Sequence, residues 1–138
     1  MPAKDIYHDA VKNALIKDGW TITDDPYRLA WGSTRLFVDL GAEQLLAAEK
    51  ESRKIAVEIK SFVGHSNMAD LERALGQYML YRTIMSETEA DRVLYLAVPK
   101  QTVREVFDEP VGRLLIDKQS LKLIVFDSKE EVVIRWIE

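Results

Sequence analysis

The sequence predicts an α/β fold built around a mixed β-sheet. Two observations support this prediction: apolar residues recur at helical spacing in two separate segments, and short apolar runs rich in β-branched residues alternate with them. The predicted order is α-β-β-β-α-β, followed by C-terminal helical turns and a β-hairpin. With 138 residues, 47% of them hydrophobic, the chain is predicted to form one domain over residues 1–138.

The first half of the chain predicts one helix and three strands. Residues 5–19 carry apolar side chains at helical spacing, and Gly19 ends the helix. A short strand is expected at 20–23, closed by the turn signal "DDPY". Residues 35–50 begin as a strand that Gly41 interrupts as a bend or bulge. After the turn-like "ESRK", a buried strand follows at 55–62.

The second half predicts a long helix followed by a strand and an appendage. The helix covers 67–85, with an asparagine or aspartate near its start as cap. Residues 92–99 read as another buried strand. Residues 100–118 suggest helical turns broken at Pro110. The last 18 residues alternate cleanly around "SKE" and predict a β-hairpin.

Composition limits the class of protein. The net charge is −4, with 19 basic and 23 acidic residues, which argues against loose, charge-driven binding of nucleic acid but leaves room for a local basic groove. The absence of cysteine excludes disulfides and thiolate zinc sites. No apolar run reaches the roughly 20 residues of a membrane span, and the N-terminus lacks a signal-peptide layout. We therefore expect a cytoplasmic protein without a membrane segment.

A pair of acids and a lysine suggest phosphodiester chemistry. Glu58 and Lys60 lie two residues apart on a predicted strand and so point to the same side, and Asp39 precedes them on a neighbouring strand. Two carboxylates suit Mg²⁺ or Mn²⁺, which polarises a phosphoryl oxygen and activates water, and a lysine stabilises developing charge. The alternative is a solvated strand face. "DSK" at 127–129 matches the same pattern, but it lies in a predicted turn.

The sequence leaves two acids as candidates for the second metal ligand beside Glu58. Asp39 precedes Glu58 by 19 positions, which is long for a tight hairpin. A hairpin centred on "EKES" would place Glu43 opposite Glu58, whereas a bulge at Gly41 would restore Asp39 to that place. Asp39 and Glu43 therefore both remain candidates.

The long helix carries a polar stripe. Arg73, Gln77 and Tyr81 follow one another at four-residue spacing and share one face. The other face is predicted to pack on the sheet through Leu71, Leu75, Tyr78 and Met79. A glutamine in so apolar a helix needs partners, because burying an unpaired amide is costly. Gln77 thus indicates a site, a core polar contact or a subunit interface.

These motifs resemble the PD-(D/E)XK nuclease superfamily in its RecB-like form. More specifically, the segments "HDAVKNALIKDGW", "VDLGAEQLLAAEK", "IAVEIKSF" and "ALGQYMLYR" resemble the XisH family of cyanobacterial fdxN-element excision controlling factors. The resemblance implies a restriction-endonuclease-like fold and a role in programmed DNA excision beside a partner called XisI. It also implies a catalytic set, matched by position to Asp39, Glu58, Lys60, Gln77 and Tyr81.

The match to the superfamily pattern has gaps. Val38 stands where the proline of "PD" would be. The superfamily often adds an acid or histidine from the first helix, for which His8 and Asp9 are candidates. Asp9 also reads as a surface acid, and His8 as a structural histidine. Two functions stay open: a Mg²⁺-dependent DNA endonuclease or nickase, and a non-cleaving regulatory subunit. DNA and an XisI-type protein are the expected partners, and a homo-oligomer is left open.

Overall fold

The computed structural model describes residues 4–46 and 51–138. The helices and strands follow one another in this order: α1 (His8–Lys17), β1 (Thr21–Asp24), β2 (Tyr27–Trp31), β3 (Thr34–Val38), β4 (Leu40–Leu46), β5 (Glu51–Ile59), α2 (Asn67–Thr88), β6 (Arg92–Pro99), α3 (Lys100–Thr102), the π-helical turn η1 (Val103–Phe107), α4 (Pro110–Gln119), β7 (Leu123–Asp127) and β8 (Val132–Ile137).

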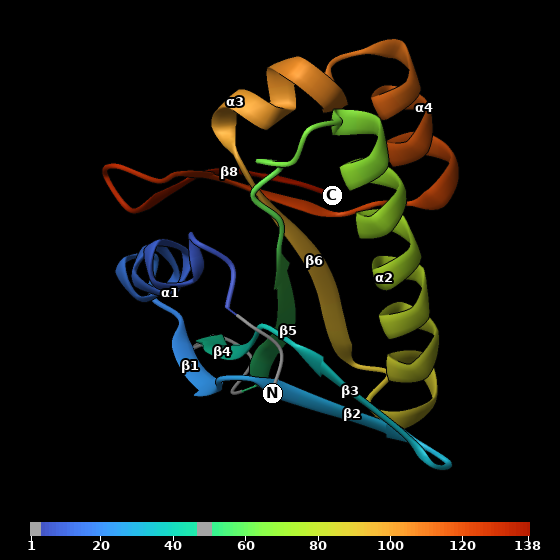
Figure 1. The fold of residues 1–138 in the computed structure, drawn as a ribbon. Helices are drawn as coiled ribbons and strands as arrows, with labels where there is room; N and C mark the ends of the chain where they lie inside the picture. The colour runs from blue at the N-terminus through green and yellow to red at the C-terminus, as the bar shows by residue number, and fades with distance from the viewer. Residues whose placement is uncertain (1–3, 47–50) are drawn as a thin grey trace.

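Six strands form one mixed sheet in the order β1-β4-β5-β6-β7-β8. The central pairs β5–β6 and β6–β7 are parallel, and the other pairs are antiparallel. The predicted α-β-β-β-α-β order is confirmed as α1, β1, β4, β5, α2 and β6, and the C-terminal hairpin is β7–β8 (Figure 1). The helical turns expected between them are α3, η1 and α4, and Pro110 begins α4.

One hairpin was not predicted. Strands β2 and β3 pair with each other in a separate two-stranded sheet, inserted between β1 and β4. The predicted strand from residue 35 is therefore two strands, which meet at a bend at Asp39. Gly41 is not a bulge in the β4–β5 pair, where it sits regularly opposite Ala56. It is required instead for close approach, since a Cβ there would lie 2.8 Å from an Asp24 carboxylate oxygen.

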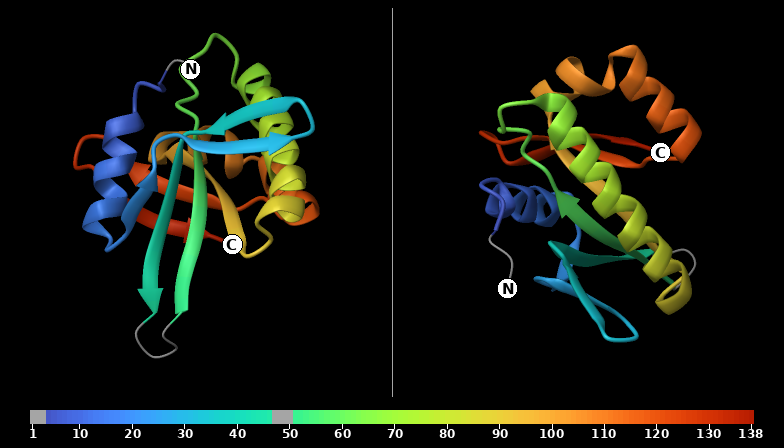
Figure 2. Two further views of the ribbon diagram at one scale, coloured as in Figure 1. Left: turned by 90° about the horizontal axis from the view of Figure 1, so that it is seen from below. Right: turned by 45° about the vertical axis from the view of Figure 1, so that its right-hand side comes forward.

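Two apolar cores lie on opposite faces of the large sheet. Helix α1 covers one face and α2 the other, where α3, η1 and α4 also pack (Figures 1 and 2). Because strand side chains alternate, Val57 and Ile59 enter the α1 core while Ala56 enters the α2 core. Glu58 therefore points to the α2 side. None of the helices in the described residues is both long and apolar enough to cross a membrane.

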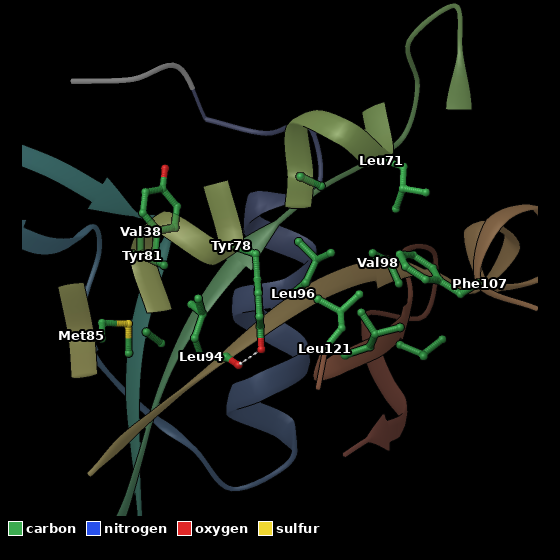
Figure 3. Packing of buried hydrophobic residues seen from close by; sticks show 14 of the residues in the cluster. Val38, Leu71, Tyr78, Tyr81, Met85, Leu94, Leu96, Val98, Phe107 and Leu121 are labelled. Carbon is green, nitrogen blue, oxygen red and sulfur yellow. Dashed lines mark hydrogen bonds between the residues drawn. The ribbon is translucent and has the colours of Figure 1, made fainter. Parts of the chain in front are cut away.

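Helix α2 is fixed at its start and in its middle. Ser66, rather than the expected Asn or Asp, caps it by accepting a hydrogen bond from the Ala69 N–H at 3.2 Å. Tyr78 is buried and donates its hydroxyl to the Leu94 carbonyl of β6 at 2.9 Å (Figure 3). Met79, expected against the sheet, is instead exposed. These contacts fix the rotation of α2 and turn the side of Gln77 and Tyr81 towards the end of β5.

Candidate active site

A pocket of about 190 Å³ opens at the carboxyl end of β5. Four segments meet there: the residues before α1, the end of β3 with its following bend, the end of β5, and the middle of α2. Figure 2 shows the N-terminal segment, the β2–β3 hairpin and the chain after β5 gathered on the same side of the molecule. The lining residues are Lys4, Asp5, Phe37, Asp39, Glu58, Ile59, Lys60, Gln77 and Tyr81.

The register of β4 and β5 brings the two acids together. Leu40 pairs with Val57, so the next step along the hairpin puts Asp39 beside Glu58. Two hydrogen bonds fix this arrangement: the Ile59 N–H donates to Asp39 Oδ2 at 2.7 Å, and the Asp39 N–H donates to Glu58 Oε1 at 3.3 Å. Each carboxylate is thus held by the backbone of the other acid's strand.

Burial shifts both acids towards the protonated form, and the charge of Asp39 adds to the shift of Glu58. Glu58 is 7% exposed, and burial together with the negative charge of Asp39 raises its pKa to about 9. Burial also raises the pKa of Asp39, against the opposing effect of the Ile59 N–H. A cation between the two would oppose the shift, because opposite charge favours the ionised form.

Helix α2 contributes a hydroxyl and an amide. Burial, with the nearby charges of Glu58 and Asp39, raises the pKa of Tyr81 to about 12, so its hydroxyl stays protonated at neutral pH. Gln77 Oε1 is buried and has no hydrogen-bond partner among the described residues. A buried acceptor without a donor is rare in native proteins and marks a place for a ligand or water. Lys60 adds a half-buried ammonium side chain to the same pocket.

Asp5 is a pocket residue that the sequence analysis missed. Its carboxylate accepts hydrogen bonds from the Tyr7 N–H at 2.9 Å and from the Ser61 N–H at 3.1 Å. It thereby ties the start of α1 to the end of β5, directly after Lys60. The contact to Tyr7, two residues on, is a local turn that an aspartate ahead of a helix often makes, and this was the signal available. The contact to Ser61 has no signal in the sequence.

The first-helix candidates lie outside the pocket lining. His8 is buried, and its Nε2 lies 2.8 Å from Asp25 Oδ1. Lys12 donates to the other oxygen of Asp25 at 2.8 Å, so His8 belongs to a three-residue polar cluster. Asp9 is exposed on α1. Arg73 is exposed on α2, one helical turn before Gln77, and so stands near the rim rather than in the lining.

The alternative register that favoured Glu43 is wrong. Glu43 pairs with Lys54, four residues from where that register would place it, and its Oε1 lies 3.8 Å from Arg92 Nη2. The observed register of β4 and β5 differs by four residues from the one assumed around "EKES", so Asp39 becomes the neighbour of Glu58. Glu43 therefore lies away from the pocket, beside a buried arginine.

The second triplet forms a turn. Asp127 Oδ1 accepts the Lys129 and Glu130 N–H groups at 2.9 and 3.0 Å, and Oδ2 accepts Lys100 Nζ at 2.8 Å. The Lys100 hydrogen bond is the main reason that the pKa of Asp127 falls to about 2. Oδ1 therefore holds the β7–β8 turn, and Oδ2 holds Lys100 of α3.

The donor set in the pocket fits a metal ion that keeps several of its waters better than one that needs a full set of protein ligands. Within residues 4–46 and 51–138 there is no group of three or more His, Asp or Glu side chains placed to hold a metal ion. Mg²⁺ needs fewer, since it keeps several waters and is commonly bound through one or two carboxylates. Asp39 and Glu58 supply that number, and Gln77 Oε1 offers an acceptor for a bound water. The residues present therefore fit Mg²⁺ or Mn²⁺.

The fold and the pocket together define a mixed α/β domain with a nuclease-like core. The family model described as "XisH protein" matches residues 1–134, and the chain belongs to the XisH family. It is similar to two solved structures, each with a TM-score of 0.88. Among curated proteins there is no significant match.

Both structures cover nearly the whole chain. An XisH family protein from Nostoc punctiforme PCC 73102 is 38% identical, with 97% of this chain and 100% of that chain covered. An fdxN element excision controlling factor protein from Anabaena variabilis is 40% identical, with 98% and 100% covered. The family and fold expected from the sequence are thereby confirmed.

Proposed function

We propose that this protein is a metal-dependent DNA-cleaving factor that acts in the programmed excision of a DNA element in the cytoplasm, together with an XisI-type partner. The observation that carries the proposal is the convergence of Asp39, Glu58, Lys60, Gln77 and Tyr81 in one pocket. Support for excision comes from the Anabaena variabilis relative, whose name describes an fdxN element excision controlling factor.

Each pocket residue has a role in hydrolysing a phosphodiester. Mg²⁺ or Mn²⁺, when bound, supplies the positive charge that polarises the phosphoryl group and acidifies water. Asp39 and Glu58 are the residues that would hold it. The Lys60 ammonium stabilises the negative charge that develops on the phosphoryl oxygens. Gln77 Oε1 accepts a hydrogen bond from a water and so orients it.

Tyr81 acts as a neutral donor in this scheme. Its raised pKa keeps the proton on the hydroxyl, so it donates a hydrogen bond and does not serve as a base. It also stands on the buried side of α2, one turn after Gln77, where it closes the pocket floor towards the apolar core.

A second candidate function is a non-cleaving regulatory subunit. It is favoured by the absence of a three-ligand metal cluster in the described residues and by the net charge of −4. Such a subunit would control excision through contacts with DNA, with the XisI-type partner, or with a second copy of itself. The fold alone does not choose between these functions.

The deciding experiment compares the wild type with Lys60→Ala on supercoiled DNA with Mn²⁺, with and without the XisI-type partner. If the pocket cleaves DNA, loss of the ammonium should lower the nicking rate on the order of a hundredfold. DNA affinity should change much less, because one phosphate contact is a small part of total binding. Lys129→Ala, in the β7–β8 turn, is the matched control and should nick normally.

The opposite result would favour the regulatory subunit. It consists of no metal-dependent nicking by the wild type under either condition, together with normal excision in cells carrying Lys60→Ala. Circular dichroism and melting of both variants verify that any loss reflects chemistry, since Lys60 is only half-buried and its removal should barely alter folding.

A further inference from the structure

The β2–β3 hairpin has one exposed face that leads away from the pocket. We propose that this face binds the phosphate backbone of DNA and directs the strand to the pocket, with Arg28 and Arg35 as the contacting residues. The inference rests on the proposed function for the choice of DNA as ligand. It adds a binding surface that lies outside the pocket lining.

The hairpin register places these residues on one side. Arg28 pairs with Phe37, and Ala30 pairs with Arg35, and directly opposite residues share a face. Phe37 lines the pocket. Moving outward from the pocket, the face therefore presents Phe37 beside Arg28 and then Arg35 beside Ala30, without a break between the candidate catalytic groups and the two guanidinium groups.

The other face of the hairpin holds it in place. Tyr27, Leu29 and Val38 are buried in the α2 core, and Leu36 packs against them. The Tyr27 hydroxyl also donates to Glu89 Oε2 at 3.0 Å. A hairpin with one face buried is a stable platform, whereas an isolated two-stranded hairpin is marginal in water. The hairpin runs along the lower edge of the molecule (Figure 1), and its packing on α2 holds the arginine face in a fixed orientation.

The charge of the hairpin contrasts with that of the whole chain. Residues 27–38 contain two arginines and no acid, although acids outnumber bases 23 to 19 over the chain. Two of the other arginines are neutralised: Arg53 pairs with Glu138 and Arg92 with Glu89. Among the ion pairs of the described residues, none involves Arg28 or Arg35. Charge is therefore segregated locally, as binding to a polyanion requires.

The spacing of the two arginines fits a DNA strand. They are diagonal neighbours across the hairpin, which separates such residues by about 7–8 Å. One DNA strand carries a phosphate about every 3.4 Å of helix axis, so two arginines this close together can contact neighbouring phosphates of the same strand. Arg35 Nη1 donates to the Gly32 and Thr34 carbonyls at 2.7 and 3.0 Å, which fixes its guanidinium beside the turn. Its remaining N–H groups are available to a phosphate.

The test measures binding and nicking separately. Binding of a short fluorescein-labelled DNA duplex is followed by anisotropy in Ca²⁺ at several salt concentrations, and nicking of supercoiled DNA is followed in Mn²⁺. Arg28→Glu with Arg35→Glu should weaken binding roughly tenfold or more at low salt, and Arg28→Ala alone should reduce the salt slope by about one. Arg28→Lys keeps the positive charge and should retain most of the binding.

Arg135→Glu is the matched control, an exposed arginine on edge strand β8, and it should bind DNA as the wild type does. Arg35 also supports its own turn. If the double variant fails to fold for that reason, the Arg28 single variants decide the test. Equal affinity of Arg28→Glu and wild type, or an equal loss with Arg135→Glu, would overturn the inference. So would a wild type that does not bind the duplex at all.

The two proposals fail in different ways. If the wild type binds DNA through the hairpin but nicks nothing with or without the partner, the hairpin inference stands and the nuclease proposal falls. If hairpin variants bind and nick like the wild type, the nuclease proposal stands and the hairpin inference falls.

Discussion

Two polar clusters are buried against strand β5, and they are built in opposite ways. Near its middle, Arg92 donates to the Ile55 carbonyl at 2.8 Å and to both oxygens of Glu89 at 3.0 Å, and its guanidinium lies 4.6 Å from the ring centre of Tyr27. These hydrogen bonds lower the pKa of Glu89. Near the carboxyl end of β5, Glu58 lies beside a second acid.

The two clusters differ in whether their charges are paired, and this difference distinguishes a cluster that stabilises the fold from one that is a candidate functional site. The Arg92 cluster pairs opposite charges and satisfies its donors, so it contributes to folding. The pocket sets two carboxylates together and leaves Gln77 Oε1 without a donor, which costs folding energy in the absence of a ligand. Such destabilising groups are expected where binding of a ligand compensates for them. Acids with shifted pKa values in a pocket are accordingly candidates for a functional site.

The largest expected effect comes from breaking the satisfied cluster. Arg92→Ala should lower the free energy of unfolding by about 3 kcal/mol, because it leaves Glu89 without its paired cation and the Ile55 carbonyl without its donor. Urea unfolding measures this. Arg135→Ala removes an exposed arginine and should stay within about 0.5 kcal/mol of the wild type. Equal effects of the two variants would show that the Arg92 cluster contributes no more than the surface.

Replacing glutamate by glutamine should change the free energy of unfolding in opposite directions in the two clusters. In metal-free protein at pH 7, Glu58→Gln should raise the free energy of unfolding on the order of 2–3 kcal/mol, whereas Glu89→Gln should lower it. Glu58 takes up a proton on folding, since its pKa is about 9 in the folded state against an ordinary 4.5, and glutamine avoids that step. Glu89 instead loses a charge that Arg92 stabilises.

The pH dependence of Glu58→Gln follows from the same shift. Because the folded state holds the proton more tightly, the wild type should lose stability as pH rises from about 4.5 to about 9, and the raised pKa of Asp39 acts in the same direction. The variant should lose less over that window. Parallel profiles of wild type and variant from urea unfolding with EDTA would contradict the raised pKa of Glu58.

Metal binding should stabilise the pocket and so reduce the difference in stability contribution between the pocket and the Arg92 cluster. Mg²⁺ at about ten times its dissociation constant should add about 1.4 kcal/mol to the stability of the wild type, seen as a rise in melting temperature. Glu58→Ala should abolish this rise and Glu43→Ala should preserve it, because Glu43 lies beside Arg92 instead of in the pocket. A rise that persists in Glu58→Ala would remove Glu58 from the site.

The smallest effect is expected at the turn that Asp127 forms between β7 and β8. Asp127→Ala and Lys129→Ala should leave nicking and excision unchanged, since Asp127 uses one oxygen to form a turn and the other to bind Lys100, and neither residue lines the pocket. Nicking of supercoiled DNA by the folded variants measures this. Loss of nicking without loss of structure would mean that the wrong triplet was assigned to catalysis.

Much of the fold was predictable because it depends on local pattern. Helical spacing identified α1 and α2, and apolar runs identified β5 and β6. The β2–β3 hairpin was missed, because its strands are five residues long and half-exposed, and the preceding turn signal hid the start of the first. Its two-residue turn at Gly32 and Ser33 lacks an Asn-Gly or Asp-Gly pair, but Gly-Ser with a positive φ at Gly32 is itself a hairpin signal, which the sequence analysis overlooked.

The pocket was predictable in its residue types but not in its pairing. The assumed and observed registers of β4 and β5 differ by four residues, an even number, so both keep every side chain on its own face. Alternation therefore cannot choose between Glu43 and Asp39. Asp5 depends on a contact to Ser61, 56 positions away, which only the folded chain supplies.

The insertion of the hairpin makes the molecule modular. Tyr27 and Val38 pair at its base, so the chain leaves and re-enters the large sheet at nearly the same place. A segment whose ends meet tolerates changes of length, and adding residues in pairs to each strand preserves which side chains face outward. Evolution and design can therefore lengthen this arm at its exposed tip, while its buried base stays in the α2 core and β4 and β5 keep Asp39 beside Glu58.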